Sequence, residues 1–62
     1  SIPSGQKLTL GGKEFTVAQS GDKYTVYLTV DDRNYKVSGD KTYEDLIVVM
    51  ADSITAIEED EE

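Results

Sequence analysis

The side chains that most often carry catalysis or bind transition metals are missing from this sequence. It has no histidine and no cysteine, which excludes disulfides, zinc fingers, haem ligation and thiol chemistry. Carboxylates, lysines, tyrosines and hydroxyls remain, but no G-x-S-x-G, P-loop or Gly-rich dinucleotide motif arranges them for a reaction. We therefore expect a protein that is not an enzyme, with no catalytic residues, no cofactor and no metal site.

One adjacent pair of carboxylates, Asp31 and Asp32, has the composition of an acid–base or cation site. Neighbouring acids in a turn point in different directions and stay solvated, whereas an EF-hand loop needs acids at alternate positions, a central glycine and a closing glutamate. Aspartate also bonds to nearby backbone and tolerates left-handed conformations, as turns require. The pair is therefore interpreted as part of a turn, "DDRN".

Charge is distributed unevenly along the chain. Residues 1–41 carry a formal charge of +1, whereas residues 42–62 carry eight acids and no base, which leaves a net charge of -7. Because the C-terminal part would repel phosphate, we do not expect binding to duplex nucleic acid. A protein partner with a basic surface, or self-association, is the expected kind of partner.

Five residues of the C-terminal part are candidates for partner binding. Glu44, Asp45 and Asp52 precede the terminal acidic run and would present charge at fixed spacing, in a way that could mimic phosphates in a basic site of a partner. Val48 and Val49 would lie on a helix flank away from the core, where apolar side chains can mark a subunit or partner contact. Isolated exposed valines are also ordinary at protein surfaces, so both interpretations of the valines stay open.

An alternative site consists of Lys23, Tyr27 and Lys36 on the predicted sheet face away from the core. Single-strand nucleic-acid binders stack bases on exposed aromatic rings and hold phosphates with basic side chains. Such modules commonly stack bases on two or three aromatics, and a lone tyrosine is also explained by its high β propensity.

Alternation of apolar and polar residues predicts four short strands. "KLTL" (7–10) and "KEFTV" (13–17) flank a pair of glycines that suits a hairpin turn, while "KYTVYLTV" (23–30) and "YKV" (35–37) follow other turn sequences. The apolar face of this antiparallel meander is predicted to consist of Leu8, Leu10, Phe15, Val17, Tyr24, Val26, Leu28, Val30, Tyr35 and Val37. A sheet with one apolar face needs a cover.

The cover is predicted to be an amphipathic helix. Thr42 and Asp45 resemble a capping box, with aspartate in place of the usual glutamate or glutamine, and Glu44 and Asp45 suit the positive end of the helix dipole. The core stripe of this helix, at spacings of three and four, is predicted to consist of Tyr43, Leu46, Ile47, Met50, Ile54 and Ile57. The alternative is a small SH3-like β-barrel with a short helix over 43–51 and a fifth strand at 53–59, because β-branched residues are less favourable in helices. We expect the former, an α+β fold with a four-stranded antiparallel β-meander covered by one C-terminal amphipathic helix.

A chain of 62 residues has room for one domain. We expect a single α+β domain over 1–57 and a disordered acidic tail over 58–62, because carboxylates at a helix C-terminus face the negative end of the dipole and repel one another. No signal peptide and no apolar run long enough to span a bilayer is present, so we expect no membrane association, and the cytoplasm is slightly favoured. Since the sequence does not begin with methionine, we expect a processed chain or a domain excised from a larger protein.

These features indicate a non-catalytic, small acidic protein-interaction module. It would serve as an adaptor, an inhibitor or an assembly component, of a kind that a virus or phage could encode. The alternatives are a single-stranded nucleic-acid binder that uses the exposed sheet face, and a self-associating structural subunit.

Overall fold

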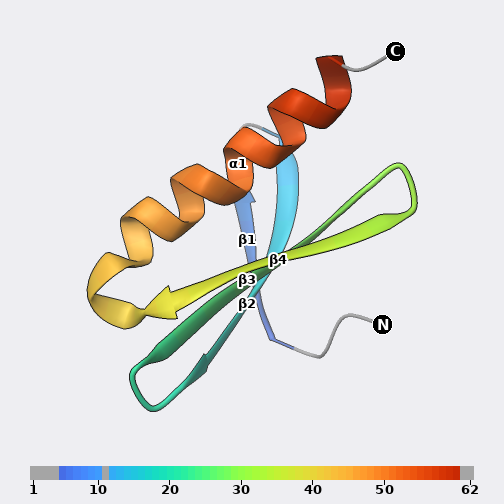
Figure 1. Ribbon diagram of the computed structural model, residues 1–62. Coiled ribbons are helices and arrows are strands. Elements are labelled where there is room, and N and C mark those ends of the chain that lie inside the picture. The colour runs from blue at the N-terminus through green and yellow to red at the C-terminus, as the bar shows by residue number, and fades with distance from the viewer. Residues whose placement is uncertain (1–4, 11, 61–62) are drawn as a thin grey trace.

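The computed structural model describes residues 5–10 and 12–60 of the chain. Four antiparallel strands form one sheet in the order β1-β2-β3-β4, and a short 3-10 helix leads into one long α-helix that lies across the sheet (Figure 1). The elements are β1 (Gln6–Leu10), β2 (Lys13–Ser20), β3 (Lys23–Val30), β4 (Arg33–Asp40), η1 (Lys41–Tyr43) and α1 (Glu44–Asp60). The α+β meander with a C-terminal helix is thus confirmed. The barrel alternative is wrong, because residues 53–59 continue the helix.

Two-residue turns join β2 to β3 and β3 to β4. Asp31 and Asp32 have φ values of 50° and 67°, and a type I′ hairpin turn requires positive φ at both central residues. The turn interpretation of this pair is therefore confirmed. The turn is shorter than "DDRN", because Arg33 and Asn34 already belong to β4.

The face of the sheet that meets α1 holds most of the core. Phe15, Val26 and Leu28 are its largest fully buried side chains. The other residues of the predicted apolar face are buried or half-buried, except Leu10, which is 39% exposed. Period-2 alternation therefore identified the core side of every strand.

The start of the helical segment differs from the predicted capping box. The carboxylate of Asp40, and not the hydroxyl of Thr42, acts as the cap: Asp40 Oδ1 accepts a hydrogen bond of 2.8 Å from the Thr42 backbone N–H. This bond lowers the pKa of the Asp40 carboxyl below its ordinary value. Thr42 lies inside η1, so the cap precedes the predicted position by two residues, while Glu44 and Asp45 occupy the first turn of α1 as predicted.

The side of α1 that packs on the sheet differs from the predicted core stripe. It is displaced around the helix axis by roughly a quarter of a turn, at 3.6 residues per turn. Ile47, Ala51 and Thr55 are buried against the sheet, whereas Leu46 and Met50 are 55% and 50% exposed. The prediction that these last two belong to the core is wrong. It is also wrong for Tyr43 and Ile57, which are 61% and 64% exposed, so that Ile47 and Ile54 are the residues of the predicted stripe that pack on the sheet. Small residues explain the rotation: Ala51 is completely buried, and a Cβ atom on Gly39 of β4 would lie only 3.2 Å from Ile47 Cδ1. Larger side chains at this contact would hold the helix farther from the sheet.

Helix α1 extends through Asp60, beyond the predicted domain boundary at residue 57. Residues 61 and 62 lie outside the described residues. The disorder of the acidic tail 58–62 stays a prediction.

Candidate protein-interaction surface

A set of large apolar side chains faces away from the sheet along η1 and α1. Each is at least half exposed, from 50% at Met50 to 64% at Ile57. We call this set the outer stripe, which consists of Tyr43, Leu46, Val49, Met50 and Ile57. Partial exposure of a single apolar residue is common at protein surfaces, but neighbouring apolar side chains over the length of a helix are typical of contact sites.

The outer stripe without Val49, together with Ser53, has the spacing of a coiled-coil seam. Tyr43, Leu46, Met50, Ser53 and Ile57 follow one another at steps of three, four, three and four residues, which is the a/d pattern of a heptad repeat. Ser53 is the one polar residue in this series, and its hydroxyl donates a hydrogen bond of 2.9 Å to the Val49 carbonyl of the same helix. The seam is therefore uncharged from its first to its last position.

The two valines proposed for partner binding lie in different environments. Val49 is 59% exposed and belongs to the outer stripe. Val48 is half-buried and packs against the core cluster, so the prediction that it lies on the exposed face is wrong. The rotation of α1 explains the difference, because it carries Val48 towards the sheet.

Glu44 and Asp45 lie at the N-terminal end of α1, beside the buried phenol of Tyr24. Burial raises the pKa of Tyr24, and the negative charges of Glu44 and Asp45 raise it further. Glu44 is half-buried and Asp45 is exposed. Of these two carboxylates, Asp45 is the more exposed.

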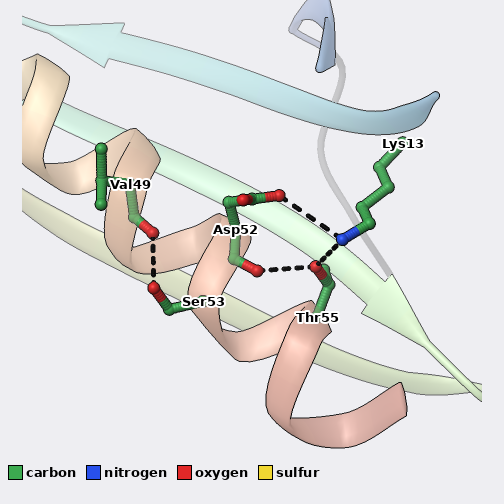
Figure 2. Close-up of polar contacts among 5 residues, drawn as sticks. All are labelled: Lys13, Val49, Asp52, Ser53 and Thr55. Carbon is green, nitrogen blue, oxygen red and sulfur yellow. Dashed lines mark hydrogen bonds and ion pairs between the residues drawn. The ribbon is translucent and has the colours of Figure 1, made fainter. Parts of the chain in front are cut away.

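Asp52 is tied to the sheet through Lys13 of β2 (Figure 2). The Lys13 ammonium lies 3.6 Å from Asp52 Oδ1 and donates a hydrogen bond of 2.7 Å to Thr55 Oγ1. Thr55 is buried, and its own hydroxyl donates to the Asp52 carbonyl at 2.7 Å. Asp52 therefore has a structural contact as well as an exposed edge, since its side chain is 44% exposed.

The importance of Lys13 was not visible in the sequence. Lys13 and Thr55 are 42 residues apart, and their contact depends on where the helix crosses β2. No local pattern in the sequence marks this contact.

The alternative site on the open face of the sheet is brought together in part. Tyr27 of β3 lies directly opposite Lys36 of β4 on one side and Thr16 of β2 on the other. Lys7 of β1 completes this cross-strand row and donates a hydrogen bond of 3.3 Å to Thr16 Oγ1. Lys7 was missed because the register of β1 must be known to place it.

Lys23 does not belong to the same row. It pairs with Asp40 of β4, four residues along β3 from Tyr27. Tyr27 is itself half-buried, which reduces the ring area that a base could stack on. The open face therefore offers one partly covered ring flanked by lysines.

A small hollow lies beneath the C-terminal half of α1. Its volume is about 290 Å³, and its lining includes the buried Phe15 and Leu28 together with Lys13, Asp31 and Thr55. This volume is at the lower limit of the roughly 300–1,000 Å³ typical of small-molecule sites. Among the acidic side chains that the structure describes, no group of three or more is placed to hold a metal ion.

Within the part of the chain that the structure describes, no helix is both long enough and apolar enough to cross a bilayer.

Comparison of the chain with protein-family models, with curated proteins and with solved structures finds no match. The functional conclusions therefore rest on the geometry and chemistry of the chain itself.

Proposed function

We propose that the protein is a non-catalytic protein-interaction module and that the outer stripe of α1 is its contact surface. The observation that carries this proposal is the exposure of five large apolar side chains along one side of one helix. Each of them already exposes at least half of its surface to water, although buried positions are available on the same helix.

The energetics support a role in binding. Full burial of a Leu, Ile or Met side chain contributes about 1.5–3 kcal/mol, so covering the exposed half of one such residue contributes about 1 kcal/mol. A partner that covers the whole outer stripe would gain several times this amount before the cost of association is subtracted. Interfaces are also enriched in aromatic residues and Met, which the stripe supplies at Tyr43 and Met50.

Site-specific photo-crosslinking tests the proposal. Benzoylphenylalanine at position 49, in the outer stripe, should give discrete cross-linked products in extract of the source cells. The same probe at position 34, which is exposed on β4, is the matched control and should not give them.

The products at position 49 should disappear when Leu46 and Met50 are replaced by serine. Circular dichroism must show that this double variant keeps its fold. Identical products from positions 34 and 49, or none from position 49, would refute the proposal.

A second candidate function is supported by the cross-strand row on the open face. Lys7, Thr16, Tyr27 and Lys36 lie side by side, with a lysine at each end and an aromatic ring between them. We propose weak binding of single-stranded nucleic acid here, with stacking on Tyr27 and phosphate contacts from the lysines.

Fluorescence anisotropy with a labelled oligo-dT at low salt tests this second function. Tyr27→Ser and Lys36→Ser should each weaken binding, and deletion of residues 58–62 should strengthen it because the acidic run competes for the lysines. Absence of binding by both the full chain and the shortened chain would eliminate it.

A further inference from the structure

We infer that the partner of the outer stripe is a basic amphipathic α-helix of another protein. This inference rests on the proposed function and specifies the chemistry of the partner. The spacing of the apolar residues in the stripe favours a helical partner, and the acidic residues beside the stripe favour a basic one.

The spacing favours a helix as the ligand. Tyr43, Leu46, Met50 and Ile57 of the stripe follow the a/d pattern, and the stripe is about 20 Å long at 1.5 Å per residue. A partner helix with two heptads of apolar residues has the same length and the same periodicity. Side chains of such a helix would pack between Leu46, Met50 and Ile57, which are exposed along the stripe.

The charges beside the stripe favour a basic partner. Asp45 and Asp52 are seven residues apart, so they lie on the same edge of α1, next to Val49 on the helix surface. Lys13 contacts Asp52 from the sheet, whereas Asp45 is exposed, and the segment 42–62 contains no base. Lysines or arginines at one flank of a partner helix, seven residues apart, would meet both carboxylates.

The same charges argue against a second copy of the chain as the occupant. Two outer stripes packed together would bring two segments of formal charge -8 side by side without a single base in either. Each pair of like charges at about 8 Å costs about 0.5 kcal/mol even in water. A basic helix converts these repulsions into attractions, which favours it over self-association.

The test uses a synthetic peptide of three heptads with Leu at a and d and Lys at e and g, and a matched peptide with Glu in place of Lys. The Lys peptide should bind the full chain and shift the amide resonances of α1 residues on the outer stripe. Its affinity should fall at least tenfold between 50 and 500 mM salt, because the attraction is screened. The Glu peptide should not bind.

Two sets of variants separate packing from charge. Leu46→Ser with Met50→Ser should weaken binding of the Lys peptide at least tenfold. Asp45→Lys should weaken it several-fold, whereas Asp22→Lys makes the same change of net charge in the β2–β3 turn and should not. Each of these residues is exposed, so the variants should retain the fold, which circular dichroism checks.

Three outcomes would overturn the inference. In the first, the Lys peptide does not bind. In the second, it binds equally to the Leu46→Ser, Met50→Ser variant, which would indicate non-specific attraction by the acidic run. In the third, the chain sediments as a dimer at micromolar concentration and this double variant is monomeric, which would identify a second copy as the occupant.

Each of these outcomes leaves the proposed function to be judged separately. Cross-links formed at position 49 and absent at position 34 would still show that the outer stripe is a contact surface. Loss of those cross-links would remove both proposals.

Discussion

The two sides of α1 differ in burial, and their hydrophobicity does not explain the difference. The inner side meets the sheet with the buried Ile47, Ala51 and Thr55, and the half-buried Val48 and Ile54 pack against the core beside them. The outer stripe is the more apolar of the two, yet it faces water. The comparison shows that fit to the sheet, and not the number of apolar atoms, decides which side of a helix is buried in a domain of this size.

The strongest test of this difference replaces an isoleucine on each side with alanine. Ile47 is 4% exposed and Ile57 is 64% exposed. Ile47→Ala should lower the free energy of unfolding by about 2–5 kcal/mol, because it removes buried methyl groups and leaves a cavity. Ile57→Ala should change it by about 0.5 kcal/mol or less. Urea unfolding followed by circular dichroism measures both.

Ile47→Ala could abolish folding altogether, because a domain of this size has a total stability of only about 3–9 kcal/mol. Ile47→Val, with an expected loss of about 0.5–1.5 kcal/mol, then provides the comparison. Equal losses at positions 47 and 57 would contradict the observed orientation of the helix.

Alanine positions test the role of close packing. Ala51 is completely buried, whereas Ala56 of the same helix is exposed. Ala51→Leu should destabilise the protein by about 1–3 kcal/mol, because the larger side chain forces the helix away from the sheet. Ala56→Leu serves as the matched control and should have almost no effect on the thermal midpoint. If Ala51→Leu were neutral, the close approach of α1 to β3 and β4 would not be the reason for its rotation.

Hydroxyl groups on the two sides give a smaller contrast. Thr55 is buried and bonds to both Lys13 and the Asp52 carbonyl, whereas Ser53 is exposed and bonds only within the helix. Thr55→Val should cost about 1 kcal/mol, because the hydrogen bond from Lys13 is lost in a partly buried place. Ser53→Ala should stay within about 0.5 kcal/mol of the original protein. Chemical denaturation measures this difference in the free energy of unfolding. A larger effect at Ser53 would contradict the finding that Thr55 faces the sheet and Ser53 faces solvent.

The smallest effect is expected at Asp40, where the chain enters the helical segment. Its pKa is lowered in the folded protein by the hydrogen bond from Thr42, so its contribution to stability is present above the ordinary value of 3.8 and is lost as the pH falls through the lower, folded value. Asp40→Asn keeps an acceptor but no longer titrates. Its thermal midpoint should therefore decline less steeply than that of the original protein below about pH 4. Parallel curves for the two proteins between pH 2 and 6 would rule out this contribution.

Much of the fold follows from local patterns in the sequence. Alternation along residues 23–30 placed Tyr24, Val26 and Leu28 on the buried face, and Asp31 and Asp32 marked a turn because few other residues accept positive φ at both positions. These features depend on neighbouring residues along the chain, so the sequence contains the information needed to find them.

The orientation of α1 and the residues around it could not be predicted in the same way. Two overlapping apolar stripes exist on the helix, and Ile47 and Ile54 belong to the predicted stripe while also packing against the sheet. The choice between the stripes depends on contacts such as that of Ile47 with Gly39, which require the three-dimensional path of β4. For the same reason, the sequence identified Asp52 and Tyr27 as candidates but not their neighbours Lys13 and Lys7.

Lysines on the outermost strands of the sheet oppose aggregation of a chain that exposes apolar side chains. Lys7 lies on β1 and Lys36 on β4, the two outermost strands of the sheet. Charged side chains on outermost strands hinder the addition of a strand from another molecule, which is the step that propagates fibrils. The chain thus exposes apolar side chains on α1 while its outermost strands carry charges that oppose strand addition. We therefore expect substitutions of these lysines to affect aggregation, and substitutions in the outer stripe to affect partner binding, independently of each other.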